Sequence, residues 1–276
     1  MIDVEALPKL RKKVVKFFTD NPEDVAILTV REIASKLEVN PATVVRACKD
    51  MGYEGFEDLK NHRKEIYRKR LVNYDIMLDK LKFESPVQEI IENSFRTDVD
   101  ILARTINEIS WETIANVVDL IANSTRTYIV GLEAASNIAN FLALELRTYL
   151  PNITEVTVGN GYLFDFIRHL RRTDIVFGIS FGSCIRQTVL GLKTAYEQGL
   201  TTIAITDSKL SPLFKYSTIP LLTASSSDFY FSAFISAMSI AHGMVNCCAE
   251  MKRKESVEQL EKVREQWEEF KLFYEQ

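Results

Sequence analysis

Polar side chains in one short segment have the spacing by which a helix can read a nucleic-acid duplex. In VNPATVVRACKD, residues 39–50, the apolar Val44 and Ala47 would face the inside of a helix. The opposite face would present a set of candidate DNA contacts, which are Asn40, Pro41, Ala42, Thr43, Arg46 and Lys49. The Arg46 guanidinium suits bidentate bonds to guanine, whereas Lys49 and Thr43 suit phosphate oxygens. This face therefore predicts an interface with double-stranded DNA.

The residues just before this segment supply the partner helix that such a reader needs. Small and apolar residues at helical spacing predict the core of a helix-turn-helix: Ile33, Ala34, Leu37, Val39, Val44 and Ala47. Asn40 can cap the second helix, and Pro41 supplies its preset first turn. Glu38 stands in the turn where a glycine is usual, so its backbone must be strained. A helical corner with solvated charges is the alternative to a DNA-binding pair.

Short apolar runs rich in β-branched residues begin at residue 127. They cover residues 127–131, 153–158, 174–180, 201–206 and 218–222. Helical patterns accompany them at residues 134–149, 161–171, 185–198 and 228–250. Buried strands that alternate with helices predict an α/β domain, a five-stranded parallel sheet with helices on both faces.

Loops rich in glycine and hydroxyl groups follow the first, third, fourth and fifth of these strands. In an open α/β sheet, ligands bind beyond the carboxyl ends of the strands, where helix N-termini present unpaired N–H groups. A lone serine-rich turn is more often a helix cap, but four such loops in one sheet favour a pocket for a phosphate or a sugar. The residues expected to bind this effector are Gly131, Glu133, Ser136, Ser180, Gly182, Ser183, Thr206, Ser225 and Ser226.

Composition divides the chain into a mildly basic head and an acidic body. Residues 1–70 hold 15 Lys+Arg and 12 Asp+Glu, within a chain of net charge −4. We expect an all-α DNA-binding domain over residues 1–76, a helical linker over 77–122, the sheet domain over 123–250 and a C-terminal helix over 251–276. An apolar stripe in that last helix predicts packing on another helix, in this subunit or a partner: Leu260, Val263, Trp267, Phe270 and Tyr274.

No spacing in the sequence assembles a catalytic or metal-binding set. The three histidines (His62, His169 and His242) favour ordinary surface or core roles, and nothing pairs Glu133 with Asp228 near the expected pocket. The four cysteines lack metal or redox spacing and indicate a reduced, cytoplasmic protein, and no run has membrane-spanning length. We expect no enzyme and no cofactor. A sugar-phosphate isomerase-like enzyme with an accessory helical head, or a sensor whose head binds protein, stays open as an alternative.

The stretch VNPATVVRACKDMGYEGFEDLK resembles the signature of the RpiR family of bacterial transcriptional regulators. The similarity includes the core from Thr43 to Arg46 and the exit at Gly52, while Ala47 and Met51 depart from the family's aromatic and leucine. The family joins a helix-turn-helix head to a SIS (sugar isomerase) domain. The resemblance implies a homodimer or homotetramer that binds an operator and senses a phosphosugar or related metabolite, controlling genes of carbohydrate metabolism.

The sheet half is similar to the SIS domain but departs from it at the expected pocket. The family's phosphate loop commonly reads Ser-x-Ser-Gly-x-Thr, whereas here Ser180 is followed by Phe-Gly-Ser-Cys-Ile. In the first loop Glu133 replaces the family's second glycine. A carboxylate beside a phosphate loop repels the ligand unless Arg186 or another cation compensates. We therefore expect a pocket whose ligand differs from an ordinary sugar phosphate.

Overall fold

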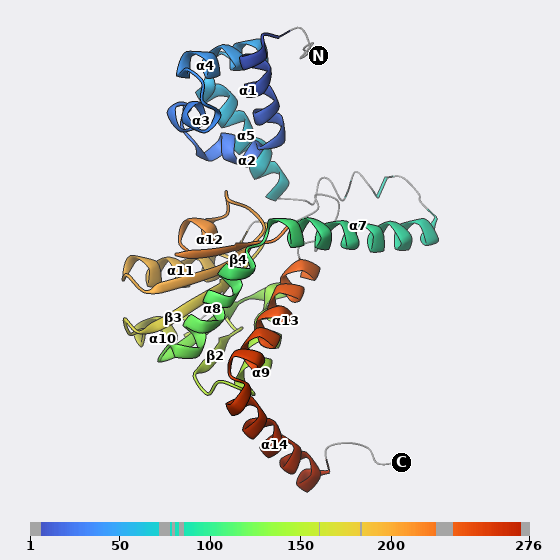
Figure 1. Ribbon diagram of the computed structural model, residues 1–276, viewed down its shortest axis with the longest axis vertical. Helices are drawn as coiled ribbons and strands as arrows, with labels where there is room; N and C mark the ends of the chain where they lie inside the picture. Colours follow the sequence, from blue (N-terminus) through green and yellow to red (C-terminus); the bar gives the residue numbers. More distant parts are fainter. Residues whose placement is uncertain are drawn as a thin grey trace. The chain divides into compact units, whose positions relative to one another are not determined.

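The computed structural model describes residues 7–71, 78, 81–82, 86–159, 161–182, 184–224 and 234–271. Its contacts divide the chain into two compact units. The helical unit is Met1–Asp75 with the tripeptide Ser208–Leu210, and the sheet unit is Ile76–Asp207 with Ser211–Gln276. Figure 1 labels most elements of the two units, and each unit is described by itself.

The helical unit is built from five helices around one apolar core. They are α1 (Lys9–Asp20), α2 (Pro22–Ile27), α3 (Val30–Leu37), α4 (Pro41–Asp50) and α5 (Phe56–Leu71). Its buried side chains come from all five: Val14, Val15, Phe17, Phe18, Val25, Ile33, Ala34, Leu37, Val44, Ala47, Cys48, Phe56 and Leu59. The inward positions predicted for the helix-turn-helix lie in this core, with Val39 partly buried against it.

Local chemistry fixes where α3 and α4 begin and end. Thr29 caps α3 through a capping box with Glu32. Glu38 ends α3 at φ 53° and ψ 45°, so the left-handed backbone expected in the turn is present without a glycine. Asn40 then accepts a hydrogen bond from Ala42 N–H at 2.9 Å, and Pro41 is the first residue of α4. The predicted turn and cap are therefore confirmed.

The sheet unit contains the five parallel strands that the sequence predicts. They are β1 (Arg126–Gly131), β2 (Ile153–Val156), β3 (Asp174–Ile179), β4 (Thr201–Thr206) and β5 (Ile219–Leu222). Their order is β2-β1-β3-β4-β5, and every neighbouring pair is parallel. The chain reverses its direction of growth across the sheet between β2 and β3. The loops after β1, β3 and β4 therefore lie in consecutive positions along one edge.

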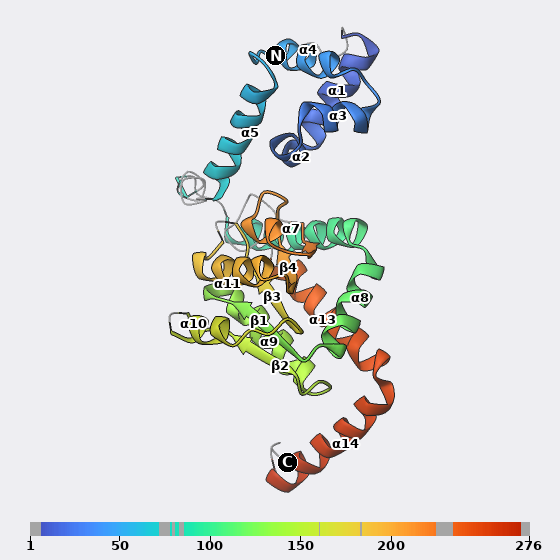
Figure 2. The ribbon, with the colours of Figure 1, turned by 90° about the vertical axis from the view of Figure 1, so that its left-hand side faces the viewer.

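Helices cover both faces of this sheet, as Figure 2 shows. Alternate strand residues such as Ile129 and Phe177 pack with α8 (Trp111–Asn123), α9 (Ser136–Arg147) and α13 (Phe234–Met251). Their neighbours Val130 and Val176 pack with α10 (Gly161–Arg168), α11 (Arg186–Glu197) and α12 (Pro212–Lys215). The predicted helix over 228–250 is described only from Phe234 onward, so its first turns lie outside the described residues.

A long helix precedes this core and is tied to it near its C-terminal end. α7 (Val87–Glu108) has Pro86 as its N-cap. The buried Thr105 Oγ1 accepts a hydrogen bond from Ala224 N–H at 3.1 Å and lies 3.1 Å from Ser236 Oγ. This hydroxyl joins α7 to the exit of β5 and to α13.

The C-terminal helix α14 (Arg253–Phe270) keeps most of its apolar side chains in solvent. Trp267 is 45% exposed and Phe270 is 69% exposed, while Tyr274 lies outside the described residues. The stripe predicted to pack on another helix is therefore largely exposed in the described part of this subunit. Packing on a partner subunit stays a prediction.

Candidate functional site

The outer face of α4 presents the side chains predicted to contact DNA. Asn40, Pro41, Ala42, Arg46 and Lys49 are exposed, and Thr43 is half-buried. The inner face is sealed against the helical core by its apolar side chains, among them the completely buried Val44, Ala47 and Cys48. Burial raises the pKa of the Cys48 thiol to about 12, so it stays a protonated core group. One helix thus divides cleanly into a packed side and a polar side.

Several other cations of the helical unit are already bound within the protein. Lys13 Nζ donates to Leu37 O at 2.8 Å at the end of α3. Lys60 Nζ donates to Ile27 O at 3.0 Å and to Leu28 O at 2.9 Å at the end of α2. These ammonium groups cap helix C-termini, where the backbone carbonyls have no intrahelical partner.

Arg46 and Lys49 differ, because no described group of the protein binds their charges. Neither side chain makes a hydrogen bond or ion pair within the described part of the chain. Their helix is held in place by a neighbour, since Arg11 Nη1 donates to both oxygens of Asp50 at 2.8 and 2.9 Å. A fixed helix with two available cations can offer a guanidinium to a base edge and an ammonium to a phosphate. Asn40 differs from these two residues, because its side-chain oxygen already accepts the hydrogen bond that caps α4.

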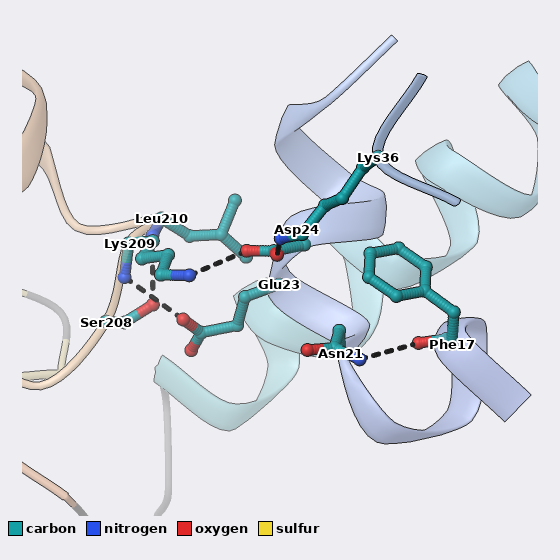
Figure 3. A network of polar contacts seen from close by, with 8 residues as sticks. All are labelled: Phe17, Asn21, Glu23, Asp24, Lys36, Ser208, Lys209 and Leu210. Atoms are coloured by element: carbon teal, nitrogen blue, oxygen red, sulfur yellow. Dashed lines mark hydrogen bonds and ion pairs between the residues drawn. The ribbon is translucent and has the colours of Figure 1, made fainter. Parts of the chain in front are cut away.

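A buried carboxylate on α2 binds two ammonium groups within the helical unit, and Figure 3 shows these contacts. Asp24 on α2 accepts hydrogen bonds from Lys36 Nζ and Lys209 Nζ, both at 2.8 Å. The Lys209 backbone N–H donates to Glu23 at 3.0 Å, so the tripeptide 208–210 is joined to this unit at two points. Burial by itself raises the pKa of Asp24, but the ammonium groups of Lys209 and Lys36 outweigh it and hold the pKa below its usual value.

The loop after β1 brings a carboxylate to the predicted effector edge. Gly131 ends the strand, and a Cβ there would lie 2.7 Å from Ala135 O and 2.8 Å from the Ala139 Cβ, so only glycine fits. Glu133 follows in the left-handed region at φ 54° with its side chain exposed. Ser136 is half-buried as the first residue of α9. The glycine that the SIS resemblance implies at position 133 would relax this backbone, and Glu133 keeps the same conformation without it.

The loop after β3 is closed by bonds within the sheet unit. Ser180 is buried, and its Oγ accepts a hydrogen bond from Ile185 N–H at 3.1 Å. Gly182, at φ 57°, donates its N–H to the two carboxylate oxygens of Asp207 at 3.1 and 3.2 Å. Asp207 follows β4, so one hydrogen bond joins the ends of neighbouring strands. Ser180 and Gly182 thus take part in the loop's own structure.

The hydroxyl group at the end of β4 is also bonded within the sheet unit. Thr206 is completely buried, and its hydroxyl donates to Ser211 Oγ at 2.8 Å. Ser211 caps α12 by accepting from Leu213 N–H and lies 3.3 Å from Cys184 Sγ. Thr206 therefore lies at the predicted edge, but inside the protein.

The structure brings only part of the predicted effector set together. Ser180 and Gly182 meet in the loop after β3, and Glu133 and Ser136 stand in the loop after β1. Ser183, Ser225 and Ser226 lie outside the described residues. The sequence reasoning missed Asp207 as a partner of the β3 loop. Its signal was an acidic residue directly after a strand that neighbours β3.

The described histidine, cysteine and acidic side chains form no metal-binding group. His62 Nδ1 lies 2.7 Å from Tyr53 Oη, and His169 and His242 are exposed. No group of three His, Cys, Asp or Glu side chains in the described ranges could hold a metal ion. Within the same ranges, no helix combines the length and apolar character needed to cross a bilayer. Asp228 lies outside the described residues.

Comparison with known families assigns each half of the chain separately. Residues 3–69 match the helix-turn-helix domain of the rpiR family, and residues 120–249 match the SIS domain. An HTH-type transcriptional regulator from Caldanaerobacter subterraneus is 27% identical over 77% of this chain and 74% of the relative. The regulator YbbH from Bacillus subtilis is 24% identical over 80% of this chain and 77% of the relative.

Solved structures agree with this assignment. The sugar isomerase domain of an RpiR transcription factor from Sphaerobacter thermophilus is 25% identical, with a TM-score of 0.61 over 64% of this chain and 99% of that one. The Vibrio vulnificus NanR protein, solved in complex with ManNAc-6P, is 20% identical, with a TM-score of 0.59 over 99% of this chain and 97% of that one. The second likeness concerns the fold, and it extends over both halves.

Proposed function

Since this chain is an RpiR-family transcriptional regulator, with an rpiR-type helix-turn-helix followed by a SIS domain, we propose that α4 reads operator DNA while the sheet unit senses a metabolite. Arg46 is the residue that contacts a base, and Lys49 and Thr43 contact phosphates. Asn40, Pro41 and Ala42 lie at the end of α4 that enters the groove. The protein acts where its DNA is, in the cytoplasm.

The observation that carries the DNA proposal is the state of the two cations on α4. Lys13 and Lys60 are bonded to helix ends, while Arg46 and Lys49 stay exposed and unpaired within the described residues. A cation without an internal bond on a rigid helix contributes more binding free energy at a phosphate or a guanine edge than a bonded cation would, because no internal bond has to be broken first.

The effector proposal rests on the sheet edge and on the relatives. NanR was solved with a phosphosugar, and we extend the class, a phosphosugar or related metabolite, to this chain. The loops after β1, β3 and β4 lie at the carboxyl edge where open α/β sheets bind ligands. The proposed effector contacts are Glu133 and Ser136, together with Ser183, Ser225 and Ser226, which lie outside the described residues. Gly131, Ser180, Gly182 and Thr206 then shape the loops that carry these contacts. Genes of carbohydrate metabolism are the corresponding targets.

A homodimer or homotetramer is the form in which such a regulator meets a two-fold operator. The helix α13 packs on α8 and α9 of its own chain, so it offers little free apolar surface. By contrast, Val87, Ile91, Phe95 and Val99 recur every fourth residue along α7 and are each more than half exposed. We place the subunit contact on this α7 stripe and on the stripe of α14.

Selection of bound duplexes from a random library tests the DNA proposal. We expect the full-length protein to enrich a sequence with two-fold symmetry, and its affinity to fall steeply with salt. The Lys49→Ala variant should keep the same preferred sequence with a salt slope smaller by about 0.9 per subunit contact. Failure to enrich any sequence, together with salt-independent binding, would reject the proposal.

A further inference from the structure

The first turn of α4 presents an apolar group on the face that carries the two exposed cations. Ala42 lies four positions before Arg46 and seven before Lys49, a spacing that places the three side chains on one side of a helix. All three are exposed, while Val44 and Ala47 are buried against the helical core. The methyl group of Ala42 therefore faces the same surroundings as the guanidinium of Arg46.

The cap of α4 holds this methyl group in a fixed position. The Ala42 N–H donates to Asn40 Oδ1 at 2.9 Å, and the Thr43 N–H donates to Asn40 O at 2.8 Å. Pro41 has no N–H, and Val44 is completely buried. These first four residues of the helix therefore offer no backbone N–H group to a ligand. Their exposed side chains are the apolar Pro41 and Ala42.

An apolar side chain at this end of a recognition helix restricts the base that it can face. The N-terminal residues of such a helix contact the base edges in the major groove. A base group that donates or accepts hydrogen bonds would lose water there and gain no partner from an alanine side chain. Thymine is the base that places a methyl group in the major groove, and alanine contacts this group without such a loss.

We propose that Ala42 reads a thymine in each operator half-site through contact between the two methyl groups. Four residues of α4 advance about 6 Å, and successive bases along one strand are about 3.4 Å apart. This thymine therefore lies within about two base pairs of the guanine that Arg46 contacts. The inference rests on the proposed function and adds a second base to the sequence that α4 reads.

Replacement of single thymines by uracil in the enriched duplex tests this proposal, because uracil differs from thymine only by the missing methyl group. In fluorescence anisotropy with the full-length protein, one such replacement should weaken binding by about fourfold. The Ala42→Gly variant lacks the methyl group of the protein, so it should bind the thymine and uracil duplexes equally. Each protein is compared with itself on two duplexes, so a change in its overall affinity cancels in the ratio.

Ala103→Gly is the matched control, since it removes an exposed methyl group from α7 and should keep the ratio of about four. Ala42→Ser is a second variant, because serine supports a helix better than glycine does. Its hydroxyl replaces part of the apolar contact and should also lower the ratio. Equal binding of wild type to the thymine and uracil duplexes overturns the proposal. A preference for thymine that Ala42→Gly retains in full overturns it as well.

Duplex selection with the same preparations separates this inference from the proposed function. An enriched operator whose thymines all tolerate replacement by uracil would reject the inference alone. The absence of any enriched sequence would reject the proposed function, and the inference with it.

Discussion

The helical unit and the sheet unit use their polar side chains in opposite ways. On α4 the charges of Arg46 and Lys49 are exposed and make no bond within the described residues. At the carboxyl edge of the sheet, Ser180, Gly182 and Thr206 are bonded to other groups of the protein. A polar residue at a predicted site can therefore be available to a ligand or can already be bonded within the protein. The hydrogen bonds inside the protein decide which.

The largest stability effect should come from a buried group of the sheet edge. Thr206→Val keeps the shape but removes the buried hydroxyl that donates to Ser211 Oγ, so we expect a loss of about 1–3 kcal/mol in the free energy of unfolding. Urea denaturation of the full chain measures this loss. Thr154→Val, at an exposed position of β2, is the control and should change stability by less than about 0.5 kcal/mol. Unchanged stability in Thr206→Val would show that the Thr206 hydroxyl does not support the fold. The sheet edge would then resemble α4, whose polar groups are available to a ligand.

A second prediction concerns the buried carboxylate of the helical unit. Asp24→Asn should cost about 1–2 kcal/mol near neutral pH, a value reduced because both lysine partners are partly exposed. The pKa of Asp24 is lowered by folding, so its contribution is complete above the unfolded pKa of about 4 and is lost as the pH falls through the folded pKa. The free energies of unfolding of wild type and Asp24→Asn should therefore converge as the pH falls from 7 into the acid range. A difference in unfolding free energy that grows as the pH falls would contradict the lowered pKa of Asp24.

Substitution of Asn40 tests whether this polar side chain at the start of α4 supports the fold, unlike Arg46 and Lys49. Its oxygen caps the helix, so Asn40→Ala should lower stability by about 1 kcal/mol, whereas Asn40→Asp should be close to neutral because it can accept the same bond. Thermal unfolding of the two variants gives the answer. If Asn40→Ala is as stable as the wild type, the side chain is available to DNA in the same way as Arg46.

The sequence predicted well those features that depend on periodicity. The 3.6-residue period placed Val44 and Ala47 inside and Arg46 and Lys49 outside, and the β-branched runs located all five strands. It predicted less well what each loop residue does. The bond between Gly182 and Asp207 spans 25 positions and exists because β3 and β4 are neighbours, which composition does not reveal.

The same limit applies to the apolar stripes. The stripe of α14 was visible as a spacing, but whether its own chain covers it depends on the folded path of that chain. The α7 stripe was not recognised, although Val87, Ile91, Phe95 and Val99 repeat at four-residue intervals. Helical period identifies an apolar face and leaves its partner undetermined.

Base reading by Arg46 is measured by the ratio of operator to non-operator affinity at one fixed salt concentration. Fluorescence anisotropy with the selected operator and a scrambled duplex gives this ratio for wild type and Arg46→Ala. We expect the variant to be as stable as wild type but to lose about 1–3 kcal/mol of discrimination between operator and scrambled duplex. An unchanged ratio would show that the exposed guanidinium of α4 does not read the bases.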